Sequence, residues 1–306
     1  MDSTYLPFTG EQLNEHFIGV RGAAQDGRYL KHYEDSIKQA QEYDELLRRG
    51  TKPTPQQTRQ GRQIEKDERF WVAAALMALY HSADSSPGEL FGSLLQRAGL
   101  QPPSAFLHWK DALAGRLDLF FEVSLPSPRG YKAWLREHLG ERVPIPYLRE
   151  QADARGVRLE GPTHADAVLL ARRTGVAVIF EAKVLSDVST DITFDLARNQ
   201  LARTIDVMLE PPGRRVPLNE RNPEQTFLVL VTPEIVRGGT AQNAISRSRL
   251  YGWLMPAYMD PGNSLLSQHL PHRDRQQLAE AASRIGWASW EDCNAVEPKA
   301  CSWLDR

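Results

Sequence analysis

Two apolar segments joined by a short turn constrain the fold of this chain more than any other feature. Residues 164–171 (HADAVLLA) and 176–184 (VAVIFEAKV) are rich in Val, Ile, Leu and Ala, and RRTG lies between them. Segments of this length and composition are typical of β-strands, and a short turn that ends in glycine favours antiparallel pairing. We therefore predict a β-hairpin in the core of the molecule.

A third strand is predicted at residues 226–233 (TFLVLVTP), where the apolar run is nearly continuous. Such a run is typical of a strand that is buried on both faces and parallel to a neighbour. A helix is predicted before this strand, at residues 193–210, with Thr193 as N-cap and Pro211 as the stop. The order of helix, strand, strand, helix, strand, with a first helix at 131–139, favours an α/β fold: a mixed sheet flanked by helices.

The chain before this unit is expected to be mainly helical. Apolar residues recur at helical spacing in 28–49, and helices are also expected at 62–81 and 88–98. The segment 117–125 (LDLFFEVSL) fits either a strand or a helix.

Three regions follow from this pattern. We expect a helical N-terminal region at 1–125, an α/β core at 126–240 and a C-terminal extension at 241–306 that packs on the core. A short helix at 146–154 and another near 273–285 complete the expected elements.

Composition excludes several classes of protein. The 306 residues carry a net charge of -2, so the chain is not globally basic and any phosphate contact must come from a local patch. Cys293 and Cys301 are the only cysteines, too few for a disulfide framework or a four-cysteine zinc site. The first residues lack the pattern of a signal peptide, and no apolar run reaches the roughly 20 residues of a membrane span. We therefore expect a cytoplasmic protein with no membrane partner.

The residues best suited to metal binding and catalysis lie at the end of the second predicted strand. Because side chains alternate along a strand, Glu181 and Lys183 share one face, and the register of the hairpin can bring Asp166 beside Glu181. Two carboxylates and the backbone carbonyl of Ala182 are ligands that suit Mg²⁺ or Mn²⁺. Lys183 can orient or help deprotonate an attacking water, and it can stabilise charge on a phosphoryl group.

This arrangement resembles the PD-(D/E)XK nuclease superfamily, which is also called restriction-endonuclease-like. The likeness covers roughly residues 131–235: a helix, a strand with Asp, a Glu-x-Lys strand, a helix with Gln and an apolar strand. It implies that Asp166 and Glu181 hold the metal and that Lys183 is the catalytic lysine. It also implies that Gln200 supports the site near the metal or the scissile phosphate.

The resemblance also suggests a further acid on the first core helix. Glu137 is the best placed there, with Glu141 and Glu150 as rivals. Two positions depart from the family pattern. Ala165 stands where many members have Pro, which is common variation, and Thr204 stands where one exonuclease subtype has Tyr, which argues against that subtype.

Basic residues near these motifs are candidates for nucleic-acid contact. Arg198 and Arg203 lie on the predicted helix with Gln200, and Arg172 and Arg173 lie in the hairpin turn. Each can instead be an ordinary solvated charge.

The activity that the resemblance implies is metal-dependent hydrolysis of nucleic-acid phosphodiesters. DNA is the favoured substrate, RNA stays open, and we expect an endonuclease in restriction or anti-phage defence. The N-terminal helices would select the substrate or a partner and also offer a surface for a homodimer. The rival interpretation is a non-catalytic nucleic-acid- or protein-binding module on the same fold, and uptake of Mg²⁺ or Mn²⁺ would separate the two.

Overall fold

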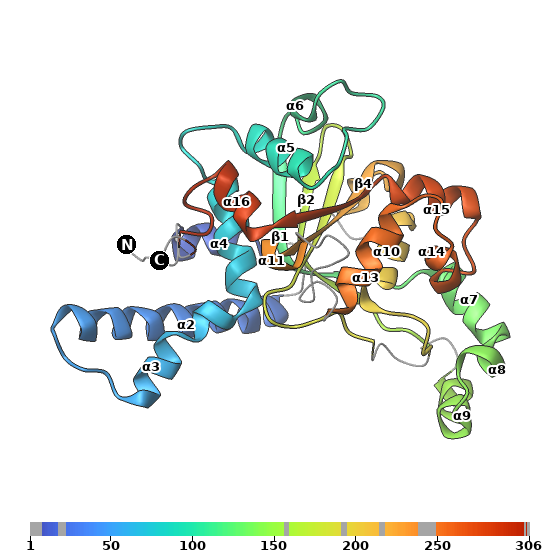
Figure 1. Cartoon of the computed structure of the whole chain (residues 1–306), viewed down its shortest axis with the longest axis horizontal. Coiled ribbons are helices and arrows are strands. Elements are labelled where there is room, and N and C mark those ends of the chain that lie inside the picture. The colour runs from blue at the N-terminus through green and yellow to red at the C-terminus, as the bar shows by residue number, and fades with distance from the viewer. Residues whose placement is uncertain are drawn as a thin grey trace.

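A five-stranded sheet forms the centre of the molecule (Figure 1). The computed structural model describes residues 8–17, 23–155, 159–190, 195–213, 218–237, 249–302 and 304. The strands follow chain order across the sheet: β1 (Leu117–Leu125), β2 (Thr163–Ala171), β3 (Ala177–Ala182), β4 (Thr226–Thr232) and β5 (Ile285–Ser289). β1, β2 and β3 pair antiparallel, and β3, β4 and β5 pair parallel. The predicted α/β class, the hairpin and the mixed sheet are confirmed.

Helices before, between and after the strands complete the described fold. The first group comprises α1 (Gly10–Glu15), α2 (Ala23–Arg48), α3 (Pro55–Gly61), the 3-10 helix η1 (Gln63–Lys66), α4 (Glu68–Tyr80), α5 (Pro87–Arg97) and α6 (Trp109–Ala112). The second comprises α7 (Arg129–Glu137), α8 (Leu139–Arg142), α9 (Pro146–Arg155), α10 (Gln200–Leu209), η2 (Leu218–Glu220) and η3 (Pro223–Gln225). The last comprises α11 (Glu234–Arg237), α13 (Leu250–Met259), α14 (Leu265–His269), α15 (Arg275–Ala282) and α16 (Trp290–Val296).

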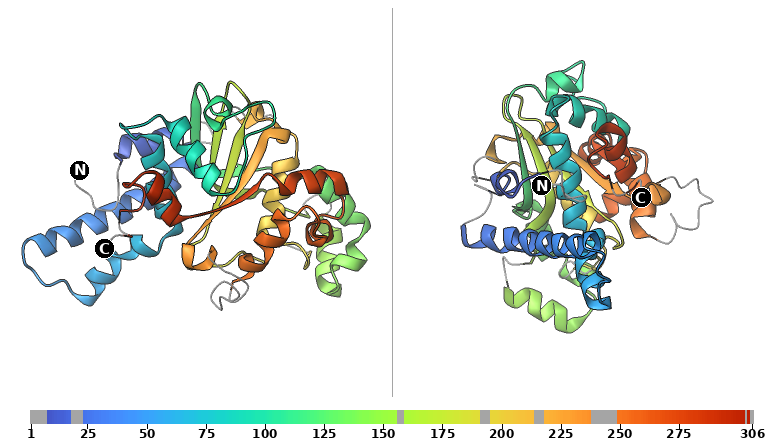
Figure 2. Two further views of the ribbon diagram at one scale, coloured as in Figure 1. Left: turned by 45° about the horizontal axis from the view of Figure 1, so that its top comes forward. Right: turned by 90° about the vertical axis from the view of Figure 1, so that its left-hand side faces the viewer.

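The sheet is buried on both faces, which explains its apolar strands. Val178 and Phe180 of β3 join one apolar cluster with residues of α4, α5 and α16, whereas Ala177 and Ile179 join a second cluster with α10, α13 and α15. Figures 1 and 2 show these helices on opposite sides of the sheet. All six residues of β3 are buried as a result.

The sheet extends beyond the expected core of 126–240 on both sides. β1 lies before residue 126, so the segment 117–125 is a strand and not a helix. β5 lies after residue 240 and pairs with β4, and its Trp287 N–H also donates to the Ala98 carbonyl at 3.0 Å. The helix expected at 273–285 ends at Ala282 because the chain enters this strand at Ile285. The boundaries at 125 and 240 therefore cut through a single sheet.

The helix expected at 193–210 begins later than predicted. α10 starts at Gln200, and the Asn199 side chain caps it by accepting a hydrogen bond from the Ala202 N–H. Thr193, the expected cap, lies outside the described residues. The Asn199 side chain satisfies one of the free N–H groups of the first turn, so the helix can begin at Gln200.

Two groups of helices project from the sheet layers. α2 and α3 form an arm at one end of the molecule, and α7, α8 and α9 form a separate group at the other (Figure 1). The second group has its own small apolar cluster, built around Tyr131 and Leu135. No helix in the described part of the chain combines the length and apolar character that a membrane crossing requires.

Candidate active site

The hairpin register brings Asp166 and Glu181 to the same place. Ala167 pairs with Phe180 across β2 and β3, so Asp166 and Glu181 are the next residues outward on the two strands. The Ala182 N–H donates to Asp166 Oδ2 at 2.8 Å, which fixes that carboxylate at the end of β3. Both carboxylates come together as the sequence predicted because strand pairing sets their separation.

Glu181 is fully buried, and only one of its two carboxylate oxygens accepts hydrogen bonds from the described residues. It is 0% exposed, and Lys183, which is 6% exposed, donates from Nζ to its Oε1 at 2.9 Å. Gln200 Nε2 donates to the same oxygen. The other oxygen, Oε2, is buried and has no hydrogen-bond partner among the described residues. A buried carboxylate oxygen without a partner is costly, and a cation would remove that cost.

The electrostatics of the site favour a bound proton or cation. Burial and the neighbouring Asp166 raise the pKa of Glu181 to about 8, although Lys183 opposes the shift. Burial also raises the pKa of Asp166, against the opposite effects of Lys183 and the Ala182 N–H. Burial alone would lower the pKa of Lys183, but Glu181 and Asp166 outweigh it and raise the pKa. Lys183 therefore keeps its proton, and the carboxylates favour either a proton or a cation.

A third carboxylate at the site comes from a helix outside the predicted α/β core. Glu68 is the first residue of α4, and its Oε2 lies 3.9 Å from Lys183 Nζ. Its Oε1 accepts from the Val184 N–H at 2.9 Å and the Ser186 N–H at 3.3 Å, which ties α4 to the segment after β3. In the sequence, Glu68 follows the N-cap Asp67 and resembles an ordinary first-turn acid. No local sequence pattern therefore indicates its role in the site.

Glu137, the acid predicted for the first core helix, lies elsewhere. It is exposed on α7, whose buried residues belong to the separate cluster with α8 and α9. The acids that act on the pKa of Glu181 are Asp166 and Glu68. We expected the acid on α7 because α7 precedes the hairpin in the sequence. The acid comes instead from α4, whose side chains share an apolar cluster with β2 and β3. The rivals Glu141 and Glu150 belong to α8 and α9 of the same separate group.

Gln200 occupies the place that the sequence predicted for it. Its backbone N–H donates to the Ser189 carbonyl at 2.9 Å, and its Oε1 accepts from the Ser189 N–H at 3.3 Å. These contacts, together with the cap at Asn199, hold the amide against Glu181. α10 thereby fixes the orientation of the carboxylate from the other side of the site.

The expectation that Arg198 faces a nucleic acid is wrong. Arg198 is 1% exposed and donates to Glu160 at 2.7 Å and to Asp206 at 2.7 Å. Its guanidinium carbon also lies 3.6 Å from the centroid of the Tyr131 ring. Arg203 turns to the protein as well, since Nη2 donates to the Gly161 and Pro162 carbonyls and Nε lies 3.2 Å from Glu160.

The arginines of the hairpin turn lie at the far end of β3. β3 has six residues, so at about 3.3 Å per residue the turn is roughly 20 Å from Glu181. Arg172 forms ion pairs with Asp118 and, at 3.3 Å, with Glu220. The Arg173 side chain packs beside Gly115. Neither arginine belongs to the carboxylate site.

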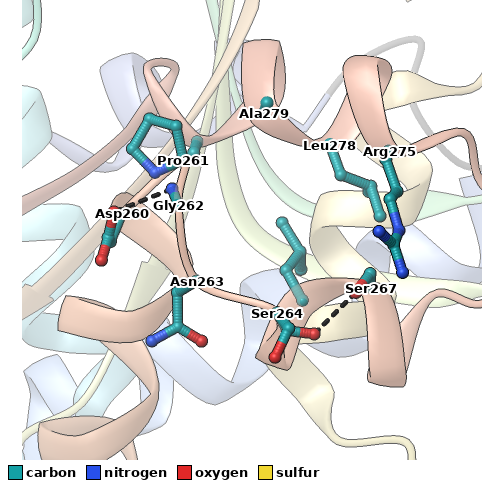
Figure 3. Close-up of a pocket in the computed structure, with 11 residues that line it drawn as sticks. Asp260, Pro261, Gly262, Asn263, Ser264, Ser267, Arg275, Leu278 and Ala279 are labelled. Atoms are coloured by element: carbon teal, nitrogen blue, oxygen red, sulfur yellow. Dashed lines mark hydrogen bonds between the residues drawn. The ribbon is translucent and has the colours of Figure 1, made fainter.

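A separate pocket is lined by α14, α15 and the loop that joins α13 to α14, and its side chains offer little for catalysis (Figure 3). Asp260 and Arg275 are its only charged lining residues, and Asp260 Oδ1 accepts from the Gly262 N–H at 2.9 Å. Its lining includes none of the residues of the carboxylate site.

The site's ligand set is small. No group of three or more His, Cys, Asp or Glu side chains in the described ranges is arranged to hold a metal ion. Asp166 and Glu181 are two such ligands, and Mg²⁺ often binds through one or two carboxylates while keeping several waters. Comparison with protein families, with curated proteins and with solved structures finds no match for this chain. Inferences about function therefore rest on the geometry.

Proposed function

We propose that this protein is a metal-dependent nuclease that hydrolyses phosphodiester bonds of DNA. The observation that carries the proposal is the pair of half-buried Asp166 and fully buried Glu181, beside the protonated Lys183, with a Glu181 Oε2 that has no hydrogen-bond partner among the described residues. Few structural needs explain such a cluster, because a buried carboxylate oxygen without a hydrogen-bond partner is costly to the fold. Perturbed carboxylates of this kind gather at functional sites.

Asp166, Glu181 and the Ala182 carbonyl are the groups that would hold Mg²⁺ or Mn²⁺. Their fit is supported by the orphaned Oε2 and by the raised pKa values of both carboxylates, which a nearby cation would lower. When bound, the ion neutralises phosphate charge and makes a water more acidic. Gln200 and the Ala182 N–H hold the two carboxylates in orientation.

Lys183 is best suited to stabilise charge. Its pKa is raised, so it is a poor base at neutral pH, but its ammonium can donate to a phosphoryl oxygen as negative charge develops. Glu181 anchors it at 2.9 Å, and Glu68 lies on its other side at 3.9 Å. Of the two roles open to the lysine, stabilisation of the transition state is therefore favoured.

The order of elements supports the restriction-endonuclease-like core. α4 brings Glu68, β2 brings Asp166 and α10 brings Gln200. Glu181 lies in β3, and Lys183 directly follows that strand. β4 then lies parallel to β3 in the middle of the sheet. By analogy of fold alone, we place the activity in restriction or anti-phage defence, as an endonuclease.

A non-catalytic binding module is the second candidate. It is favoured by the ion pair between Lys183 and Glu181, which already neutralises part of the site, and by the small set of metal ligands in the described ranges. A module of this kind would bind nucleic acid or a protein without metal.

Cleavage of plasmid and linear DNA tests the proposal. Wild type should cut with Mg²⁺ or Mn²⁺ and not with EDTA, and nicking of the plasmid would identify an endonuclease. Asp166→Asn and Lys183→Ala should each lower the rate at least about 100-fold. Glu137→Gln, an exposed acid outside the site, should cut like wild type. Cutting that persists in EDTA, or in both site variants, would refute the site; binding without cutting would favour the module.

A further inference from the structure

A basic groove lies on the helical arm, outside the carboxylate site. The residues that line it come from α3, from η1 and from the segment before α3: Lys52, Pro53, Pro55, Thr58, Arg59, Arg62, Glu65 and Lys66. We call this surface the arm groove. Four of these side chains are cationic and one is acidic, although the whole chain carries a net charge of -2.

Most cations of the arm groove have no acidic partner among the described residues. Glu65, the one acid in its lining, forms an ion pair with Arg62 at 2.8 Å. Lys52, Arg59 and Lys66 are exposed, and none of them has an acidic partner within the described ranges. Three unpaired cations on a concave surface attract a polyanion, and a concave surface focuses their field.

The arm groove lies next to the carboxylate site along the chain. Lys66 ends η1, and Glu68, only two residues further along, lies 3.9 Å from Lys183 Nζ. Figure 1 shows α2 and α3 projecting from the body on the side where α4 begins. Arg59 and Glu68 are separated along the chain by the end of α3, by η1 and by the start of α4. At about 1.5 Å per residue, this mainly helical path is roughly 10–15 Å long, or about four nucleotides of one DNA strand.

We infer that the arm groove binds the phosphate backbone of the DNA whose scissile strand enters the site at Asp166 and Glu181. This inference rests on the proposed nuclease function. Lysine and arginine that contact phosphates fix the position of a duplex and do not read its sequence. The arm groove therefore supplies affinity that depends on salt, while an otherwise weakly acidic protein avoids binding nucleic acid over its whole surface.

The test compares two triple variants that remove the same charges. The groove variant removes the three cations that lack an acidic partner among the described residues: Lys52→Gln, Arg59→Gln and Lys66→Gln. The matched control, Lys110→Gln, Arg275→Gln and Lys299→Gln, changes two lysines and one arginine at exposed positions elsewhere. Anisotropy of a labelled DNA duplex, titrated in EDTA at several NaCl concentrations, gives affinity without cleavage. Thermal melts check that both variants fold.

The groove variant should bind DNA more weakly than the control. Its plot of log affinity against log salt should be less steep by roughly 2 to 3, because each lost phosphate contact removes about 0.9. Equal slopes and affinities for the two variants would overturn the inference. So would a wild type that binds no duplex DNA, or one that uses these cations for RNA only. Groove-dependent DNA binding by a wild type that never cuts DNA would refute the nuclease function and leave the arm groove standing.

Discussion

Glu181 is buried, and one of its carboxylate oxygens has no partner in the described part of the chain. Its pKa is raised from the ordinary 4.5 to about 8. Burial is the main cause, and the adjacent Asp166 adds to it. In metal-free protein the neutral carboxyl is therefore favoured up to near-neutral pH. A divalent ion beside the same oxygen would reverse this preference, because it stabilises the charged form.

The stability of metal-free protein should fall as pH rises. The folded protein holds the Glu181 proton more tightly than the unfolded chain, so this contribution is complete below about 4.5 and is lost as pH approaches about 8. The expected loss is on the order of a few kcal/mol. Urea unfolding in EDTA across this range should show a steeper fall for wild type than for Glu181→Gln, which cannot ionise. Glu137→Gln is the control and should keep the wild-type slope; equal slopes for wild type and Glu181→Gln would contradict the burial of this carboxyl.

Arg198 should be important for stability. Arg198→Met would leave Glu160 and Asp206 short of their buried partner, and such a loss typically costs about 3–5 kcal/mol. Arg172→Met removes partly exposed ion pairs of the turn and should cost only about 0–1 kcal/mol. Chemical denaturation of both variants measures the difference. A cost for Arg198→Met no larger than that for Arg172→Met would argue against the buried network.

At the level of elements, local composition predicted the strands that are long and apolar. β2, β3 and β4 follow from their runs of branched side chains, and hairpin geometry then brought Asp166 to Glu181. β5 escaped prediction because it has only five residues, includes Gly286 and follows α15 almost directly. Glu68 escaped because its role depends on packing between segments far apart in the chain, which local patterns do not encode.

The fit of β5 into the sheet can be tested at Gly286. A Cβ at this position would lie 2.8 Å from Leu100 side-chain atoms and 3.0 Å from the Ala98 carbonyl oxygen. Gly286→Ala should therefore destabilise the protein by about 1–3 kcal/mol, as overpacking does. Gly140→Ala, on helix α8 with open space around it, should be neutral or slightly stabilising. Similar melting temperatures for the two variants would show that β5 does not pack here as described.

Across the whole molecule, the sheet joins parts of the chain that the sequence analysis assigned to three separate regions. The predicted boundaries at 125 and 240 follow changes in local pattern, but β1 and β5 pair across both of them. The net charge likewise hides an uneven distribution, since cations without an acidic partner among the described residues gather in the arm groove. The expected homodimer, DNA partner and cytoplasmic location stay predictions.

A titration with Mn²⁺ tests most directly whether the carboxylates form a metal site. Calorimetry of metal-free wild type near neutral pH should show saturable binding with release of protons, because Glu181 must ionise to bind the ion. Asp166→Asn and Glu181→Gln should each abolish or greatly weaken this binding, and Glu137→Gln should leave it unchanged. Absence of binding by wild type, or equal binding by all four proteins, would contradict the proposed site.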